Sequence, residues 1–310
     1  MKRKTILWLG LGILLFGAGC GQGNQASGPR VFGVSFQTMN NPFFVDLDEG
    51  LRSVIEARGD QLITLDAQFN SLKQKNDVSD LVLQGVSMIF INPVNWTGVK
   101  GSLLQAQDKG IGCIVVDAPV MDQGLVLSMI VSDNMEAGRM AARALVEARR
   151  PAKIGVFELS LNKACTDRIA GFLQVLAEYP DMQIVNSQEV KGTTESGRTV
   201  MLDMIGRHPE INALFAINDP SALGAISALE SVNKLADMKV VSMDGSPEAI
   251  QAILEGKLLS TSAQYPREIG IEAANVAYAH LEGRPYRQEI KVRVELINQE
   301  NAKSHLNPVP

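Results

Sequence analysis

The sequence predicts an α/β protein made of two lobes, each a doubly wound, parallel-sheet (Rossmann-like) domain. Short β-branched runs alternate with amphipathic segments along the chain, which is typical of strand–helix–strand units with parallel strands. There are too many of these units for one open sheet of usual size. Both halves of the chain also carry a similar pair of short strings, which favours an internal duplication of one domain.

The first series of units lies in the N-terminal part of the chain. Its strands are short and rich in β-branched residues, as strands generally are, and are predicted at 31–36, 61–67, 87–93 and 112–118. Amphipathic segments separate them. Helices are predicted over 43–57, from the end of the strand at 61–67 to about residue 84, and over 98–108.

The second series is predicted to begin with a strand at 125–132. Its further strands are predicted at 153–160, 184–190, 211–218, 239–245, 260–265 and 290–297. Its helices are predicted at 135–149, 167–178, 195–206, 221–233, 247–255 and 267–282.

The two series repeat one arrangement of polar strand ends. The strings are FINP at 90–93 followed by VVDA at 115–118, and AIND at 216–219 followed by SMDG at 242–245. Asn92 precedes Asp117 by 117 − 92 = 25 residues, and Asn218 precedes Asp244 by 244 − 218 = 26 residues. This shared strand and helix context supports the duplication.

The N-terminus has the order of an export signal. Three basic residues at 2–4 precede an apolar run at 6–16, which is too short to span a membrane, and then small residues at 17–19. Residues 1–20 therefore resemble a lipoprotein signal peptide with Cys20 as the lipidated residue, although Gly17 stands where that motif usually has Leu. Ordinary secretory cleavage with an incidental cysteine stays open as the alternative. A small, polar stretch at 21–30 suits a flexible tether.

Composition and motifs limit the classes of function. The net charge of −5 gives no broad basic field, so nucleic acid is not an expected partner. Cys113 and Cys165 are too few for a disulfide scaffold and are predicted to be buried small hydrophobes. The sequence has no HExxH, CxxC or GxxxxGK[ST] string, so no metal or cofactor is expected. An enzyme is not expected, although paired aspartates could mimic a glycosidase dyad.

Candidate site residues follow from one rule, that ligands bind beyond the carboxyl ends of the strands in open α/β sheets. The rule selects amides, carboxylates, a guanidinium and aromatic rings: Asn41, Phe43, Phe44, Asn92, Asp117, Arg168, Asn218, Asp244 and Gln264. A sugar hydroxyl both donates and accepts hydrogen bonds, so such a mixture suits a sugar. The apolar faces of a sugar ring pack on aromatic rings.

Each candidate also has a purely structural interpretation. Asn41 could only cap a helix, and one of Phe43 and Phe44 could be plain core because adjacent helical residues diverge by about 100°. The two aspartates could form turns, and Arg168 could be an exposed helix cation. Asp219 fits a helix N-cap before proline better than a ligand contact and is left out.

Five strings carry a resemblance to a known family. They are SFQTMNNPFF at 35–44, FINP at 90–93, FAIND at 215–219, VVSMDGSPE at 240–248 and STSAQYP at 260–266. Together they resemble the ribose-binding protein family of periplasmic sugar receptors, which has the type I periplasmic binding protein fold. The resemblance runs from Val31 to about Asn298.

The resemblance implies a function and a set of partners. It implies an extracytoplasmic, monomeric binding protein without cofactors that captures a pentose, a hexose or a related polyol between two closing lobes. It also implies delivery to the membrane permease of an ABC-type sugar importer. The nine candidate residues match family sugar-contacting positions. A sugar sensor that presents its occupancy to a chemoreceptor or histidine kinase is the alternative.

The resemblance also implies a three-strand hinge. The matching segments fall near 131–132, 264–265 and 289–290, so the first lobe would be discontinuous. The expected N-terminal lobe is 31–131 plus 265–289, the expected C-terminal lobe is 132–264 plus 290–298, and 299–310 is a tail.

Three departures from the ribose receptors concern specificity. Ala118 stands where they carry Arg after the first aspartate, and Met243 stands where they carry an aromatic residue before the second. Near Gly192 this chain has no counterpart for a further aromatic residue of the ribose receptors. A site that lacks these groups is expected to prefer a sugar other than D-ribose.

Overall fold

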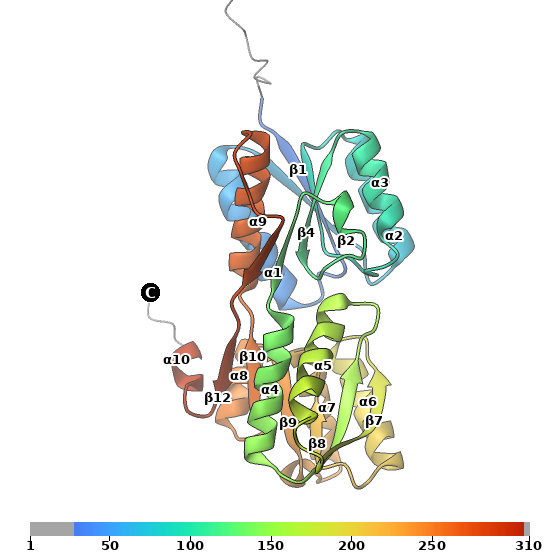
Figure 1. The fold of residues 1–310 in the computed structure, drawn as a ribbon, viewed down its shortest axis with the longest axis vertical. Coiled ribbons are helices and arrows are strands. Elements are labelled where there is room, and N and C mark those ends of the chain that lie inside the picture. Colours follow the sequence, from blue (N-terminus) through green and yellow to red (C-terminus); the bar gives the residue numbers. More distant parts are fainter. Residues whose placement is uncertain (1–27, 307–310) are drawn as a thin grey trace, which may run out of the picture.

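The structure is a computed structural model that describes residues 28–306 of the 310-residue chain. These residues form two lobes arranged along the longest axis of the molecule (Figure 1). The fold class predicted from the sequence is therefore confirmed. The leader, Cys20 and most of the predicted tether lie outside the described residues.

Each lobe is built on a six-stranded sheet. The first has the order β11-β5-β4-β3-β1-β2, with β1 Val31–Phe36, β2 Gln61–Asp66, β3 Met88–Ile91, β4 Gly112–Asp117, β5 Ser128–Ser132 and β11 Glu289–Val292. The second has the order β12-β10-β9-β8-β6-β7, with β6 Ala152–Glu158, β7 Met182–Glu189, β8 Ala213–Phe215, β9 Lys239–Asp244, β10 Ser260–Ala263 and β12 Glu295–Asn298. All neighbours pair in parallel except β10 and β12.

Helices cover both faces of each sheet. In the first lobe they are α1 Pro42–Ile55, α2 Ser71–Leu83, α3 Lys100–Asp108 and α9 Pro266–Leu281. In the second they are α4 Asn134–Ala148, α5 Lys163–Leu176, α6 Thr194–Arg207, α7 Asp219–Ser231, α8 Pro247–Leu254 and α10 Ala302–Leu306. Short 3₁₀ turns lie at Glu56–Arg58, Gln123–Leu125 and Leu235–Asp237. No helix in residues 28–306 is long and apolar enough to cross a membrane.

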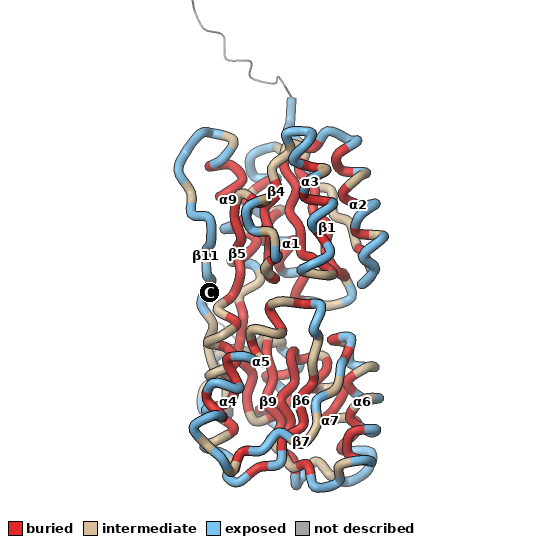
Figure 2. The backbone as a smooth tube through the Cα atoms, turned by 45° about the vertical axis from the view of Figure 1, so that its right-hand side comes forward, coloured by how far each residue is buried: buried red, intermediate tan, exposed pale blue. Residues whose placement is uncertain are grey.

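The central strands are the core of both lobes (Figure 2). Every residue of β3, for example, is buried, because a parallel strand covered by helices on both faces has no solvent side. Cys113 and Cys165 are buried, as the sequence predicted, and the structure has them as free thiols in different lobes, although the sequence had left a disulfide between them open.

Three pairs of helices pack with unusually close backbones. In the α4 and α5 pair, a Cβ atom added to Gly138 would clash with the carbonyl oxygen of Arg168, and one added to Gly171 would clash with that of Met135. The same reciprocal arrangement holds for α1 with α9 and for α6 with α7, through Gly50 with Gly270 and Gly197 with Gly224. Glycine is needed at these contacts because any side chain would separate the helices.

The described chain passes between the two sheets three times. It leaves β5 for α4, leaves β10 for α9 and leaves β11 for β12. The predicted strand at 125–132 belongs to the first sheet, not the second series, because β5 pairs with β4 and β11.

The C-terminal prediction needs two further corrections. The single strand predicted at 290–297 is two strands in different sheets, and 290–292 belong to the first lobe because Ile290 pairs with Ile130 and Val292 with Ser132. The third crossing therefore lies at 292–295 rather than 289–290. Residues 302–306 of the predicted tail form α10, which packs on α8 and buries Ala302.

Candidate functional site

A small polar cavity of about 40 Å³ lies between the lobes, beyond the carboxyl ends of the strands. Eight of the nine candidate residues line it: Asn41, Phe43, Phe44, Asp117, Arg168, Asn218, Asp244 and Gln264. The strand-end rule therefore brings together residues from both halves of the sequence. We call this cavity the chamber.

Two aspartates enter the chamber from equivalent positions in the two lobes. Asp117 is the last residue of β4 and Asp244 the last residue of β9. Their φ angles are 66° and 115°, in the region that side-chain-bearing residues rarely adopt. Such strained residues cluster at ligand sites, where the surrounding structure holds them in place.

Burial dominates the titration of both carboxyl groups. Burial raises the pKa of Asp117 to about 6, with partial opposition from the charge of Arg168 and the hydrogen bond from Asn92. Burial also raises the pKa of Asp244 to about 8, against the opposing charge of Arg168. The two groups therefore hold protons more readily than exposed carboxyl groups do.

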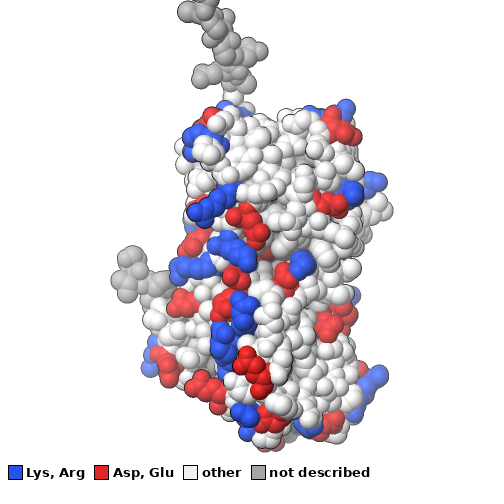
Figure 3. Space-filling model, in the orientation of Figure 1, with Lys and Arg blue, Asp and Glu red and all other residues white. Residues whose placement is uncertain are grey.

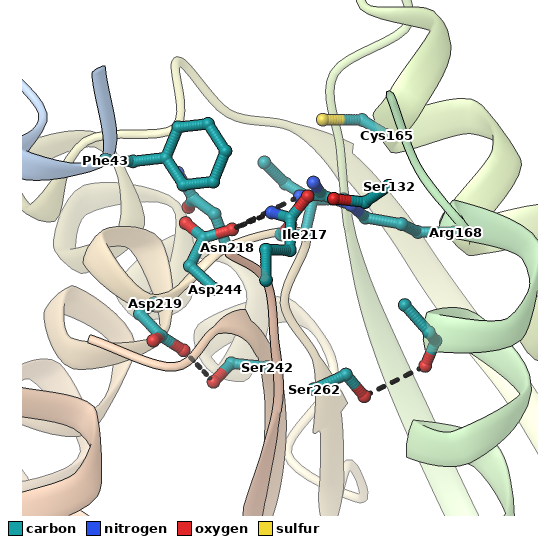
Figure 4. A network of polar contacts seen from close by, with 12 residues as sticks. Phe43, Ser132, Cys165, Arg168, Ile217, Asn218, Asp219, Ser242, Asp244 and Ser262 are labelled. Atoms are coloured by element: carbon teal, nitrogen blue, oxygen red, sulfur yellow. Dashed lines mark hydrogen bonds and ion pairs between the residues drawn. The ribbon is translucent and has the colours of Figure 1, made fainter. Parts of the chain in front are cut away.

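Arg168 is the buried cation of the chamber. It lies on α5, and its Nε donates to Asn134 Oδ1 over 2.8 Å while Nη1 donates to the carbonyl oxygen of Ile217 over 2.7 Å. Nη1 is also 3.6 Å from Asp244 Oδ1. Figure 4 shows this pair beneath the ring of Phe43. Arg168 is buried and both hydrogen bonds hold its guanidinium in place. These observations exclude the interpretation of Arg168 as an exposed cation.

Gln264 offers an unused acceptor to the chamber. Its Nε2 donates to Asp244 Oδ1 over 2.6 Å, but its Oε1 is buried and has no hydrogen-bond partner among the described residues. An unpaired buried acceptor costs free energy. A ligand that donates a hydrogen bond would remove that cost.

Asn218 lines the chamber and also caps a helix, whereas the role of Asp219 differs from the prediction. Asn218 caps α7, since its Oδ1 accepts from the backbone N–H of Ser221, and its Nδ2 donates to the carbonyl oxygen of Gly192. Asp219 is not the N-cap. It is fully buried, and its carboxylate accepts from the Ser246 backbone N–H and from two hydroxyl groups, Ser242 and Thr261. Asp219 therefore anchors the loop that follows Asp244.

Three aromatic rings line one side of the chamber. Phe43 and Phe44 are both buried and meet edge to face at 5.2 Å between ring centroids, and both line the chamber. Asn41 caps α1 through the Phe43 backbone N–H and still lines the chamber. Phe69, which the sequence reasoning missed, joins them from the loop after β2 with a φ of 56°.

Asn92 lies behind the wall of the chamber instead of in it. Its side chain is completely buried, its Oδ1 accepts from the Gln37 backbone N–H, and its Nδ2 donates to Asp117 Oδ2 over 2.9 Å. Ala118 and Met243 are also fully buried, whereas Gly192 lines the chamber. Asn92 therefore orients Asp117.

Sequence reasoning also missed polar residues on loops. Gln37, Thr38 and Asn162 line the chamber, although none of them ends a strand. Asn162 caps α5, and a capping asparagine before a helical pattern is a signal that could have identified it. Gln37 and Thr38 directly follow the strand predicted at 31–36, so the strand-end rule could have selected them as it selected Asn92.

One edge of the chamber is closed by contacts between the lobes. The Trp96 backbone N–H donates to the carbonyl oxygen of Leu161 over 3.1 Å. Asn162 Nδ2 donates to Gln37 Oε1 over 3.4 Å. We call these two hydrogen bonds the seam, and they hold the lobes together on the side of α5.

Residues 28–306 carry charged and titratable groups besides the two aspartates and Arg168 of the chamber. Acidic and basic groups are interspersed over the face drawn in Figure 3. Within residues 28–306, no group of three or more His, Cys, Asp and Glu side chains could hold a metal ion. Burial raises the pKa of the Cys165 thiol in the chamber to about 12, so the thiol stays protonated and unreactive at neutral pH.

Comparisons with known proteins agree with this geometry. The periplasmic binding protein domain family matches residues 32–285. The ribose import binding protein of Bacillus subtilis is 35% identical over 269 residues, which cover 86% of this chain and 87% of the relative. The resemblance inferred from the five strings is thus confirmed.

Solved structures show the same architecture. An ABC transporter solute binding protein from Mycobacterium smegmatis, with bound glycerol, has a TM-score of 0.86 and 30% identity, covering 91% of this chain and 98% of that one. One from Bacillus halodurans, with bound myo-inositol, has a TM-score of 0.85 and 26% identity, covering 91% and 99%. Both of these proteins hold a small polyhydroxylated ligand.

Proposed function

The chain belongs to the periplasmic binding protein domain family, and from that premise we propose that it captures a monosaccharide between its lobes and delivers it to an ABC-type importer. The family consists of extracytoplasmic substrate-binding proteins. The proposed partner is the membrane permease of that importer. We propose no catalytic step.

The observation that carries this proposal is the meeting of Asp117 and Asp244 in one chamber. They come from equivalent strand ends of the two lobes, and Arg168 lies next to Asp244. Charge-assisted hydrogen bonds from ligand hydroxyl groups to such carboxylates are among the stronger ones. Because the two groups belong to different lobes, a ligand that binds both stabilises the closed arrangement.

The proposed contacts divide by chemistry. The carboxylates and Gln264 Oε1 accept hydrogen bonds from the sugar, and Arg168 and Asn41 donate to it. Phe43 and Phe44 pack on the apolar faces of the ring. Asn218 lines the chamber from α7, and Asn92 acts through Asp117.

We propose a pentose, a hexose or a related polyol as the ligand, with D-ribose disfavoured. The reason is the set of departures at Ala118, Gly192 and Met243. Gly192 presents no side chain to the chamber. A ligand therefore finds none of the contacts that a larger residue would make at this position. A tenfold preference for D-ribose over other sugars would refute this part of the proposal.

The test is isothermal calorimetry on the chain from Gly21 to Pro310 against pentoses, hexoses, deoxysugars and polyols. Tight one-to-one binding of one member is the expected result. A folded sample that binds no member of the panel would overturn the proposal. Uptake of that sugar by cells with and without the gene would then separate import from sensing.

We also propose that residues 1–20 are a signal peptide and that Cys20 carries a lipid anchor. Two lipid signals or acyl chains are needed for stable membrane attachment, and a diacylated cysteine provides them. Cells that express the full chain are expected to incorporate labelled palmitate into it, and Cys20→Ser should abolish the label. Equal labelling of both proteins would exclude Cys20 as the site.

A further inference from the structure

A much larger groove adjoins the chamber. The chamber measures about 40 Å³ and the groove about 490 Å³. The groove runs between the start of α1 in the first lobe and the starts of α6, α7 and α8 in the second. It lies away from the seam, because none of the four residues of the seam lines it.

The groove and the chamber share part of their lining. Residues that line both are Thr38, Asn41, Phe43, Phe69, Gly192, Asp244 and Gln264. Gly192 is the smallest of them and has a φ of +69°, while an added Cβ would lie 3.2 Å from Asn218 Nδ2. The backbone conformation and the crowding both favour glycine here, so no side chain is present at this point of the shared lining.

The shared lining also contains Gln264, whose side chain carries a buried polar atom without a partner among the described residues. Gln264 is only 5% exposed, and its Oε1 has no partner among the described residues. Its amide group is oriented by the Nε2 hydrogen bond to Asp244. This acceptor is available to a donor on a ligand that passes from the chamber into the groove.

The residues that line the groove determine which chemical groups of a ligand it can bind. Four proline rings form rigid apolar surface: Pro42, Pro220, Pro247 and Pro266. Apolar surface of this kind suits the C–H faces of a sugar ring or a small aglycone. Three acids also line the groove, Asp46, Glu195 and Glu248, and no Lys or Arg does. This charge disfavours phosphate and carboxylate groups.

We propose that the chain binds glycosides or disaccharides, with one sugar ring in the chamber and an uncharged substituent in the groove. This inference rests on the proposed sugar-binding function and extends it from free monosaccharides to substituted ones. Gly192, which lines both spaces and carries no side chain, marks the point at which the substituent would leave the chamber. The three acids of the lining disfavour sugar phosphates.

The test compares free sugars with matched derivatives by calorimetry on the chain from Gly21 to Pro310, which keeps every described helix and strand. The free sugars are D-galactose, D-glucose, L-arabinose and D-ribose. Each is matched to its methyl α- and β-glycosides, and lactose, melibiose, maltose and α-D-galactose 1-phosphate complete the set. At least one uncharged derivative is expected to bind within about threefold of its free parent, whereas the phosphate binds at least about tenfold more weakly.

Variants then locate the substituent. Asp46→Trp and Glu195→Trp place a large ring in the groove at exposed positions whose side chains make no hydrogen bond or ion pair among residues 28–306. Each should weaken the derivative by about tenfold or more and leave the free sugar within about threefold. Glu147→Trp on α4 is the matched control, since Glu147 is exposed and outside the groove, and should change neither.

The outcomes separate the two proposals. Binding of a free sugar with every derivative more than about a hundredfold weaker would overturn the inference and leave the proposed function intact. Equal effects of the groove variants on free sugar and derivative would also overturn it. Binding of neither class would remove both proposals.

Discussion

Arg168 shows how one buried residue connects the stability and the chemistry of the chamber. Its guanidinium is 5% exposed and interacts with a side-chain amide, a backbone carbonyl and the Asp244 carboxylate. A buried charge is tolerated only when it is paired and hydrogen-bonded. Removing either partner therefore leaves the other one uncompensated.

At about pH 9, where Asp244 with its pKa of about 8 is ionised, Arg168→Met is expected to lower the free energy of unfolding by about 3–5 kcal/mol, because it leaves Asp244 and Asn134 without their partner. Adding Asp244→Asn should restore part of that loss, since the neutral amide needs no counter-ion. Urea unfolding of the two single variants and the double variant measures the coupling. Arg143→Met is the control. It removes an exposed ion pair with Glu136 and should cost no more than about 1 kcal/mol. Purely additive effects of Arg168→Met and Asp244→Asn would contradict the pairing.

The raised pKa values of the two aspartates predict a pH dependence of stability. The folded pKa of Asp117 is about 6 and that of Asp244 about 8, whereas the pKa of an aspartate in the unfolded chain is about 4. Between these values the folded protein binds protons that the unfolded chain does not, so the free energy of unfolding falls as pH rises from about 4 towards 8.

Asp244→Asn is expected to flatten this dependence, measured as the slope of the unfolding free energy between pH 5 and pH 8. Asp108→Asn, at an exposed position at the end of α3, is the control and should keep the slope of the parent protein. An unchanged slope in Asp244→Asn would mean that this carboxyl group is ionised throughout the range.

At the scale of single residues, sequence reasoning succeeded where position in a strand decides the environment. Asp117, Asn218 and Asp244 follow strands, and the strand-end rule placed them in the chamber. It placed Asn92 there as well, but the side chain turns back to hold Asp117. It missed Phe69, whose left-handed backbone on a loop has no sequence signal. Rotamers and loop conformations depend on packing that a single sequence does not display.

At the scale of elements, the glycine pairs set how closely the helices approach. Gly138 on α4 lies against the backbone carbonyl of Arg168 on α5. The spacing of this pair therefore also fixes where the Arg168 side chain enters the chamber. Helix and strand positions could be predicted from periodicity, but these reciprocal contacts could not, since they join segments far apart in the sequence.

Gly138→Ala is expected to lower the free energy of unfolding by about 1–3 kcal/mol, because the added methyl group forces two backbones apart. Gly206→Ala is the matched control on α6. No atom lies within 4 Å of its added Cβ, so better helix propensity should stabilise the protein by up to about 1 kcal/mol. Thermal or urea unfolding compares them, and equal effects would exclude the helix contact as the cause.

The edge strands β11 and β12 show a limit of predicting elements from the sequence. The predicted strand at 290–297 contains two strands because the chain changes sheets between Val292 and Glu295. Both halves look alike in hydrophobicity and length. Only their partners, β5 for one and β10 for the other, distinguish them.

At the scale of the whole molecule, the lobes are joined by three crossings on one side and by the seam on the other. The seam consists of one backbone and one side-chain hydrogen bond, worth about 1 kcal/mol each. Such weak contacts can open and close, whereas the three chain crossings cannot separate. The duplication and the two lobes could be predicted from the sequence, but the seam could not, because its backbone hydrogen bond is independent of side-chain identity.

Small-angle X-ray scattering is expected to show a smaller radius of gyration when the tightest sugar from calorimetry is added at saturation. The physical reason is that a ligand held by Asp117 and Asp244 favours the closed arrangement over the open one. A sugar that calorimetry shows not to bind is the control. An identical radius with and without the binding sugar would mean that the lobes do not move on binding.

The number of crossings has a consequence for the two ends of the chain. Because three is odd, a chain that starts in one lobe must finish in the other, and β1 and α10 indeed belong to different lobes (Figure 1). The distance between the ends therefore varies with the angle between the lobes. Fluorescent proteins fused at Gly28 and Leu306, the ends of the described residues, would form a donor and acceptor pair, and this fusion would act as an optical sugar sensor without any internal insertion.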